Sequence, residues 1–121
     1  MATRSRIGIE LEDGAIKSIY CHWDGYPSGV GATLAVHYTQ REKVLELISL
    51  GDISSLDEEV SPNGPHSFDN PQAGVTVAYH RDRGEKLSPA REDRDTDHFV
   101  KRGFEEYGYI FTKENKWTIF K

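Results

Sequence analysis

The chain has 121 residues, of which 36% are hydrophobic and 29% charged, and these values predict one globular domain spanning residues 1–121. A formal net charge of −5 argues against a general nucleic-acid-binding protein, which normally carries a basic face. The single cysteine, Cys21, excludes an internal disulfide and a thiolate zinc cluster, and no apolar run approaches the roughly 20 residues of a membrane span. We therefore expect a cytoplasmic protein with no membrane partner.

The first predicted element is a β-hairpin over residues 7–23, with its turn at Asp13-Gly14. Two registers are open. A two-residue turn would place the even-numbered residues of the return strand on the same face as the isoleucines of the first strand. A three-residue turn with a left-handed glycine would place the odd-numbered residues there. We favour the second register, because it buries Ile19, Cys21 and Trp23 together.

Two helices are predicted next, over residues 30–38 and 39–51, because apolar residues recur there at helical spacing. The second helix starts at a capping-box pattern, in which Thr39 is followed three residues later by Glu42. Gly51 is a favourable C-terminal stop. Residues 52–56 then form a short connector whose apolar side chains enter the core.

Two loops are predicted in the second half of the chain. Residues 57–74 are rich in proline, glycine, serine and acids, and a loop of that length is either functional or mobile. Residues 75–79 form a clear strand. The charged segment 85–94 is expected to be exposed or partly disordered.

The chain ends with a short helix and a second hairpin. The helix covers residues 98–102, is capped by Asp95 or Thr96 and ends at Gly103. The hairpin covers residues 107–120. The resulting order, β-β-α-α-β-(α)-β-β, predicts an α+β fold with an antiparallel sheet of about five strands and two to three helices on one face.

The densest group of candidate binding residues lies between the first hairpin and the first helix. Tryptophan and tyrosine are typical interface anchors and can stack on a base, while glycines let a backbone approach a ligand. The alternative is that the aromatics belong to the core and the glycines serve turns. The candidates in this group are His22, Trp23, Asp24, Tyr26, Gly29 and Gly31.

A second group of candidates follows the third predicted strand and comprises Tyr79, Arg81 and Arg83. Arginine forks bind phosphate or carboxylate groups through two hydrogen bonds. If these side chains face the first group, a phosphate-bearing ligand fits between aromatic and cationic walls. The alternative is a solvated loop in which the charges pair locally.

Three histidine–aspartate pairs suggest acid–base or metal chemistry: His22 with Asp24, His66 with Asp69, and His80 with Asp82. None has the helical His-x-x-x-His spacing of a known metal motif, and five histidines among 20 acids produce such pairs by chance. We therefore predict no catalytic residue, no metal and no cofactor. A small hydrolase that uses the first and third pairs remains the second hypothesis.

Several motifs resemble a widespread family of short, mostly uncharacterised phage and prophage proteins. The most distinctive of them are Tyr20-Cys21-His22-Trp23-Asp24-Gly25-Tyr26-Pro27, His66-Ser67-Phe68-Asp69 and Tyr79-His80-Arg81-Asp82-Arg83-Gly84. The resemblance covers most of the chain and is weakest over residues 85–94. It implies a viral accessory protein and transfers no catalytic role to any residue.

The first functional hypothesis is therefore a phage-encoded, non-enzymatic binding protein that counters a bacterial defence system in the host cytoplasm. It would either occupy a host defence protein or capture a nucleotide-like signal. A protein target predicts a flat, exposed aromatic patch. A captured signal instead predicts a concave pocket at the interface of a homo-oligomer, so the oligomeric state depends on which target is correct. The third hypothesis is a virion-associated structural module.

Overall fold

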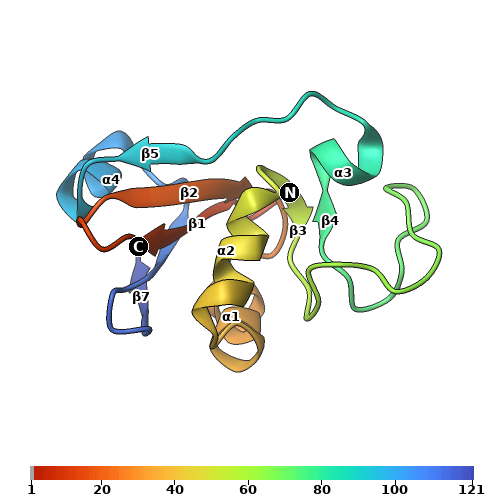
Figure 1. The fold of residues 1–121 in the computed structure, drawn as a ribbon, viewed down its shortest axis with the longest axis horizontal. Coiled ribbons are helices and arrows are strands. Elements are labelled where there is room, and N and C mark those ends of the chain that lie inside the picture. The colour runs from red at the N-terminus through yellow and green to blue at the C-terminus, as the bar shows by residue number, and fades with distance from the viewer. Residues whose placement is uncertain (1) are drawn as a thin grey trace.

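One mixed β-sheet organises residues 2–121, the part of the chain that the computed structural model describes (Figure 1). Six strands follow the order β4-β3-β2-β1-β6-β7, and β5 pairs with β2 next to β3. The strands are β1 Ser5–Glu10, β2 Ile16–Cys21, β3 Ile53–Ser55, β4 Val77–Ala78, β5 Arg91–Asp93, β6 Tyr107–Phe111 and β7 Trp117–Phe120. The helices are the π-helical turn η1 Pro27–Gly31, then α1 Ala32–His37, α2 Arg41–Ser49, α3 Tyr79–Arg83 and α4 Thr96–Arg102.

The α+β class is confirmed, but the sheet is larger than predicted and not wholly antiparallel. β1 pairs antiparallel with β2 and parallel with β6, and β2 pairs parallel with β3. The connection from β2 to β3 runs through η1, α1 and α2. Parallel neighbours need a long crossover of this kind, whereas a tight hairpin turn joins only antiparallel strands.

The predicted three-residue turn of the first hairpin is confirmed. The amide of Leu11 donates to the carbonyl of Ala15, and Gly14 has a φ of +90°, which favours glycine. Ile7 pairs with Ile19, so the odd-numbered residues of β2 face the core. The expected burial of Trp23 is wrong, because β2 ends at Cys21 and the Trp23 side chain is 45% exposed.

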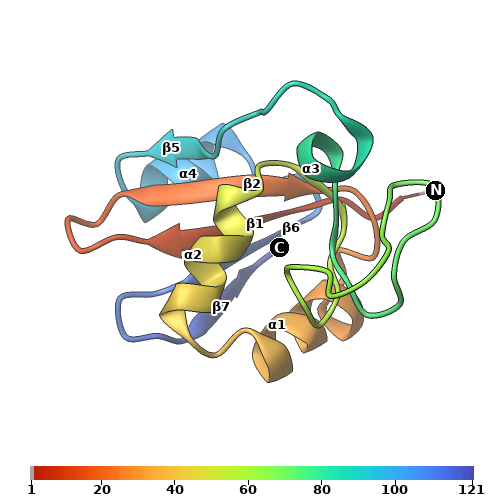
Figure 2. The same ribbon diagram turned by 45° about the vertical axis from the view of Figure 1, so that its right-hand side comes forward.

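Helices cover both faces of the sheet, which corrects the prediction of helices on one face only. Figure 2 shows α2 in front of the sheet and α4 behind it. On the first face, β1, β2 and β6 pack against α1 and α2 through the large cluster that includes Ile7, Ile19, Leu34, Leu47 and Tyr109. On the second face, α4 places Phe99 against a smaller cluster, which contains Ile16, Ile110, Phe104 and Phe120.

The boundaries of the middle helices differ from the prediction. Helical structure begins at Pro27, which suits the first turn because proline has a fixed φ and needs no amide partner. α2 begins at Arg41, and its N-cap residue Gln40 makes no side-chain capping bond, so the predicted capping box at Thr39 does not form. Gly51 follows α2 with a φ of +75°, as its predicted role as a stop requires.

Elements in the second half were predicted with mixed success. The strand predicted over 75–79 is shorter, because Tyr79 already belongs to α3. Part of the charged segment 85–94 is ordered, since β5 pairs with β2. The helix cap is confirmed: the Asp95 carboxylate accepts a 2.8 Å hydrogen bond from the amide of His98. The C-terminal hairpin of β6 and β7 is also confirmed.

Within residues 2–121, every helix is too short or too polar to cross a membrane.

Candidate ligand-binding site

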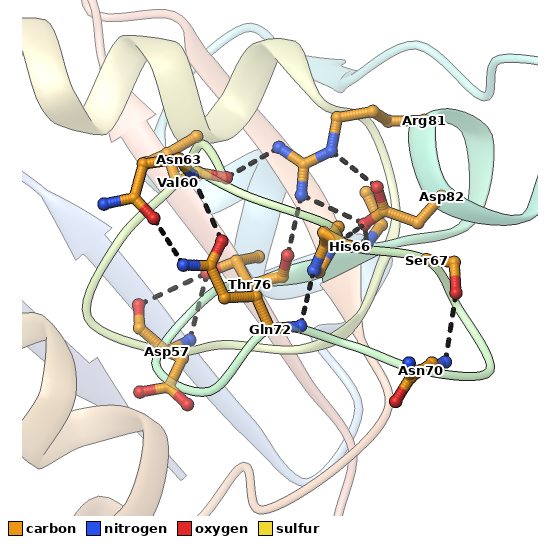
Figure 3. Close-up of polar contacts among 11 residues, drawn as sticks. Asp57, Val60, Asn63, His66, Ser67, Asn70, Gln72, Thr76, Arg81 and Asp82 are labelled. Carbon is orange, nitrogen blue, oxygen red and sulfur yellow. Dashed lines mark hydrogen bonds and ion pairs between the residues drawn. The ribbon is translucent and has the colours of Figure 1, made fainter.

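The inner side of α3, which carries Arg81 and Asp82, binds the long loop that precedes the helix (Figure 3). The Arg81 guanidinium donates to the carbonyl of Val60 at 2.6 Å and to the carbonyl of Thr76 at 2.7 Å. It also donates to both carboxylate oxygens of Asp82, at 2.7 and 3.0 Å. Arg81 is therefore engaged on three sides by its own chain.

Asp82 is the acidic partner in this network. Its carboxylate accepts a 2.7 Å hydrogen bond from the amide of Ala78 and lies 3.0 Å from Nε2 of His66. The side chains of Asp82 and His66 are only 3% and 2% exposed. Burial raises the pKa of Asp82, but the bonds from Arg81, from the amide of Ala78 and from His66 outweigh that effect and lower the pKa to about 2.

His66 reaches this pair from the middle of the loop. Its Nδ1 accepts a 2.9 Å hydrogen bond from the amide of Gln72, so the ring proton lies on Nε2, which faces Asp82. The sequence had paired His66 with Asp69 and His80 with Asp82. In the structure Asp69 is exposed and His66 joins Asp82 instead. We name Arg81, Asp82 and His66 the loop anchor.

The outer side of the same short helix carries Tyr79 and Arg83. One helical turn separates them, so their side chains meet. The Arg83 guanidinium lies 5.2 Å from the Tyr79 ring centre and 4.6 Å from that of Phe68. It also forms an ion pair with Glu85. α3 therefore separates the predicted trio, since Arg81 points into the loop and Arg83 lies between two aromatic rings.

A fork in the sheet lies next to these rings. The outer edge of β2 pairs with β5 at its start and with β3 at its end. Between the two partners the amide of Tyr20 has no strand neighbour and donates instead to Oδ1 of Asp52, at 3.0 Å. In Figure 1 the linker of residues 84–90 runs from α3 to β5 along the same edge.

A pocket of about 340 Å³ opens at this fork, and we name it the fork pocket. It combines two phenols, an imidazole, two cationic side chains and two carboxylates. Its lining residues are Tyr20, Asp52, Tyr79, His80, Arg83, Glu85, Lys86 and Ser88. Lys86 makes no hydrogen bond or ion pair with any described residue, so its ammonium group is free for a ligand.

The first candidate group touches this pocket through one hydrogen bond. The Tyr20 hydroxyl and Nδ1 of His22 are 2.8 Å apart. The His22 ring then meets Trp23 edge to face, with ring centres 4.8 Å apart. Trp23 and Tyr26 are 45% and 38% exposed, and we name His22, Trp23 and Tyr26 the aromatic surface.

Asp24 and the predicted binding glycines shape the segment itself. Asp24 has a φ of +56°, and its carboxylate accepts a 3.0 Å bond from the Tyr26 hydroxyl. A Cβ atom on Gly29 would lie 2.4 Å from the carbonyl oxygen of Asp24, and one on Gly31 would lie 3.2 Å from the Tyr109 ring. Both glycines are therefore explained by close packing within the chain.

Sequence reasoning missed five of the eight residues that line the pocket. Tyr20, Asp52, Glu85, Lys86 and Ser88 were not among the predicted site residues. The exposed character of the 85–94 segment was the available signal, because a charged segment next to an aromatic cluster can close over a ligand. The sequence does not show that this segment lies beside Tyr20 at the edge of the sheet.

The hydrolase hypothesis required His22, Asp24, His80 and Asp82 to meet in one cleft. His80 lines the fork pocket, but the buried Asp82 carboxylate is occupied by the loop anchor. Asp24 is bonded to Tyr26, and His22 to Tyr20. Among residues 2–121, no three His, Cys, Asp or Glu side chains are grouped so that they could hold a metal ion.

Comparisons with known proteins identify no relative of this chain, so the site is interpreted from its own geometry. No family model matches the chain, and searches of curated proteins and of solved structures returned no match.

Proposed function

We propose that this protein is a non-enzymatic binding protein that captures a small nucleotide-like molecule in the fork pocket. On the resemblance to phage and prophage proteins, the captured molecule would be a signal of a bacterial defence system. The observation that carries the proposal is the concave pocket at the sheet fork, with aromatic and cationic side chains on one wall. A captured signal calls for a concave pocket of this kind.

The lining offers a partner for each part of a nucleotide. The rings of Tyr20 and Tyr79 provide faces for stacking a base, and stacking on an aromatic side chain contributes about 1–3 kcal/mol per base. Arg83 and Lys86 supply cations for a phosphate. The carboxylates of Asp52 and Glu85 are acceptors for sugar hydroxyls, a role that acidic residues have in dinucleotide sites.

Non-enzymatic capture agrees with the state of the acid–base groups. The Asp82 carboxylate has a pKa of about 2 and is held by three neighbours, so it is a poor proton acceptor. Burial raises the pKa of the Cys21 thiol to about 12, which removes the reactive thiolate at neutral pH. Neither the Asp82 carboxylate nor the Cys21 thiol is therefore activated for acid–base or nucleophilic chemistry.

Native mass spectrometry of the protein purified from a bacterial host is the first test. We expect extra mass that disappears on denaturation and that matches a nucleotide-like compound. Titration calorimetry with mononucleotides, dinucleotides and cyclic nucleotides then identifies the class. If no ligand co-purifies and no nucleotide binds, the proposal fails.

Lys86→Ala and Lys101→Ala are the matched variants for this test. Both lysines are exposed, but only Lys86 lines the pocket. We expect Lys86→Ala to weaken nucleotide binding about tenfold, as loss of one charge-assisted bond does, and Lys101→Ala to leave it unchanged. Equal effects of the two variants would place the ligand elsewhere.

A host defence protein bound to the aromatic surface is the second candidate. The observation that favours it is the exposure of Trp23, which packs edge to face with His22, and of Tyr26, since exposed aromatics are frequent interface anchors. Trp23→Ala and Tyr26→Ala should abolish binding of such a protein and leave the circular dichroism spectrum unchanged. Wild-type binding by both variants would exclude this surface.

A further inference from the structure

The second face of the sheet has a polar half next to the fork pocket. α4 covers one half of that face through Phe99 and its cluster. The other half carries Arg6 and Tyr20, which are paired across β1 and β2, together with Ser18. Ser18 is in turn paired with Arg91 across β2 and β5. Directly paired residues and those two positions apart share a face, so all four side chains lie on the same side of the sheet.

Arg6 has no acidic partner there. Its Nε donates to Oγ of Ser18 at 3.1 Å, and its Nη2 donates to the carbonyl of Ser18 at 3.2 Å. These are neutral acceptors, and Arg6 forms no ion pair with any described residue. The half-buried guanidinium therefore has no directly bonded acid among the described residues and keeps unused N–H donors.

Arg91 adds a second positive charge beside it. Burial lowers the pKa of Arg6, and the neighbouring charge of Arg91 lowers it further. The carboxylates of Asp52, Glu105 and Asp93 oppose this effect without cancelling it. Each of these acids already has another partner: Asp52 binds the amide of Tyr20, Glu105 pairs with Arg4, and Asp93 contacts Arg91, His98 and Arg102.

We propose that Arg6 and Arg91 form an anion-binding subsite that takes a phosphate group. Two guanidinium groups on one face, with only part of their donors in use, match the fork geometry that binds phosphate oxygens. The assignment of this phosphate to the captured molecule rests on the proposed function, because Tyr20 lines the fork pocket and is the cross-strand neighbour of Arg6.

Inorganic phosphate is the probe for this subsite. The Nε–H signals of the arginines are followed by NMR while phosphate is added at constant ionic strength, with chloride as the control anion. We expect saturable shifts at Arg6 and Arg91 and none at Arg94, whose side chain is 74% exposed on the neighbouring loop. Equal shifts at all arginines would show an adventitious surface effect only and overturn the proposal.

Arg6→Gln and Arg94→Gln are the matched variants. We expect Arg6→Gln to weaken phosphate binding about tenfold, the effect of losing one charge-assisted contact, while Arg94→Gln binds as the wild type does. Unchanged phosphate binding by a folded Arg6→Gln variant would overturn the proposal. If Arg6→Gln does not fold, Arg6→Lys is used instead. Lysine keeps the positive charge but lacks the paired N–H donors of the guanidinium, so this variant should bind phosphate more weakly than the wild type does.

The subsite and the proposed function can fail separately. Phosphate binding at Arg6 without any nucleotide binding would keep the subsite and refute nucleotide capture. Nucleotide binding that Arg6→Gln leaves unchanged would keep nucleotide capture and refute the role of the subsite in it. If both proposals hold, Arg6→Gln should weaken a phosphorylated nucleotide more than the corresponding nucleoside.

Discussion

The two segments that flank α3 are held to the protein in different ways. The long loop of residues 57–74, which precedes the helix, is fixed by buried charges through the loop anchor. The linker of residues 84–90, which follows it, is exposed at nearly every position, and its charged residues line the fork pocket. Both segments are polar, and the sequence suggested that both could be mobile. The comparison shows that a polar segment is anchored by buried groups or left exposed according to where its charges point.

The two arginines of α3 show this difference within a single turn. Arg81 bonds to Val60, Thr76 and Asp82 on the inner side. Arg83 lies on the outer side, over an aromatic ring. Arg81 therefore contributes to the architecture of the loop, whereas Arg83 lines the fork pocket.

The largest effect is expected from Asp82→Ala, which leaves Arg81 and His66 buried without their acid. Removing one partner of a buried ion pair costs about 3–5 kcal/mol. We expect a loss of this size in the free energy of unfolding, measured with urea. A loss below about 0.5 kcal/mol, the usual range for surface substitutions, would show that the anchor does not fix the loop.

Acid should weaken the same anchor. The folded-state pKa of Asp82 is about 2, below its ordinary value of 3.8, so its stabilising contribution is complete above pH 3.8 and is lost as the pH falls toward 2. The stability difference between wild type and Asp82→Asn should therefore shrink over that interval. A difference that stays constant from pH 5 to pH 2 would contradict this assignment.

A smaller effect is expected where the linker contacts the turn after α2. Gly51 and Gly84 both have a φ of +75°, so alanine has a similar conformational cost at both positions. A Cβ on Gly51 would lie 2.5 Å from the carbonyl oxygen of Ser88, whereas Gly84 has nothing within 4 Å. Gly51→Ala should therefore destabilise the protein by about 1 kcal/mol more than Gly84→Ala does, as overpacking does. Equal losses in thermal unfolding would mean that the linker does not rest on Gly51.

The smallest effect is expected from Lys86→Ala. Because Lys86 is exposed and unpaired among the described residues, its removal should change the free energy of unfolding by less than about 0.5 kcal/mol. Thermal unfolding of the free protein measures this directly. A larger loss would show that Lys86 supports the linker, and that its effect on ligand binding is indirect.

Local patterns were enough to predict much of the fold. The alternation in β1 and β2 and the position of Gly14 gave the register of the first hairpin, and Asp95 marked the start of α4. These signals depend on a few neighbouring residues. The parallel pairing of β1 with β6 has no such signal, because its partners are separated by most of the chain.

The site was harder to predict because α3 begins where a strand pattern ends. In a strand, Tyr79, Arg81 and Arg83 would share one face, since every second residue does. In the helix only Tyr79 and Arg83 share a face. The fork pocket also depends on Asp52, whose carboxylate accepts the hydrogen bond that a neighbouring strand would otherwise accept from the amide of Tyr20. No sequence pattern around Asp52 indicates this role.

The pairing of β1 with β6 also governs the order of events during synthesis. β1 leaves the ribosome well before its parallel neighbour β6, which ends at Phe111. Until then one edge of β1 is an unpaired strand edge, which invites pairing with another chain. The first hairpin and α2 depend on local contacts and can form early, whereas β1 gains its second neighbour only once β6 has emerged.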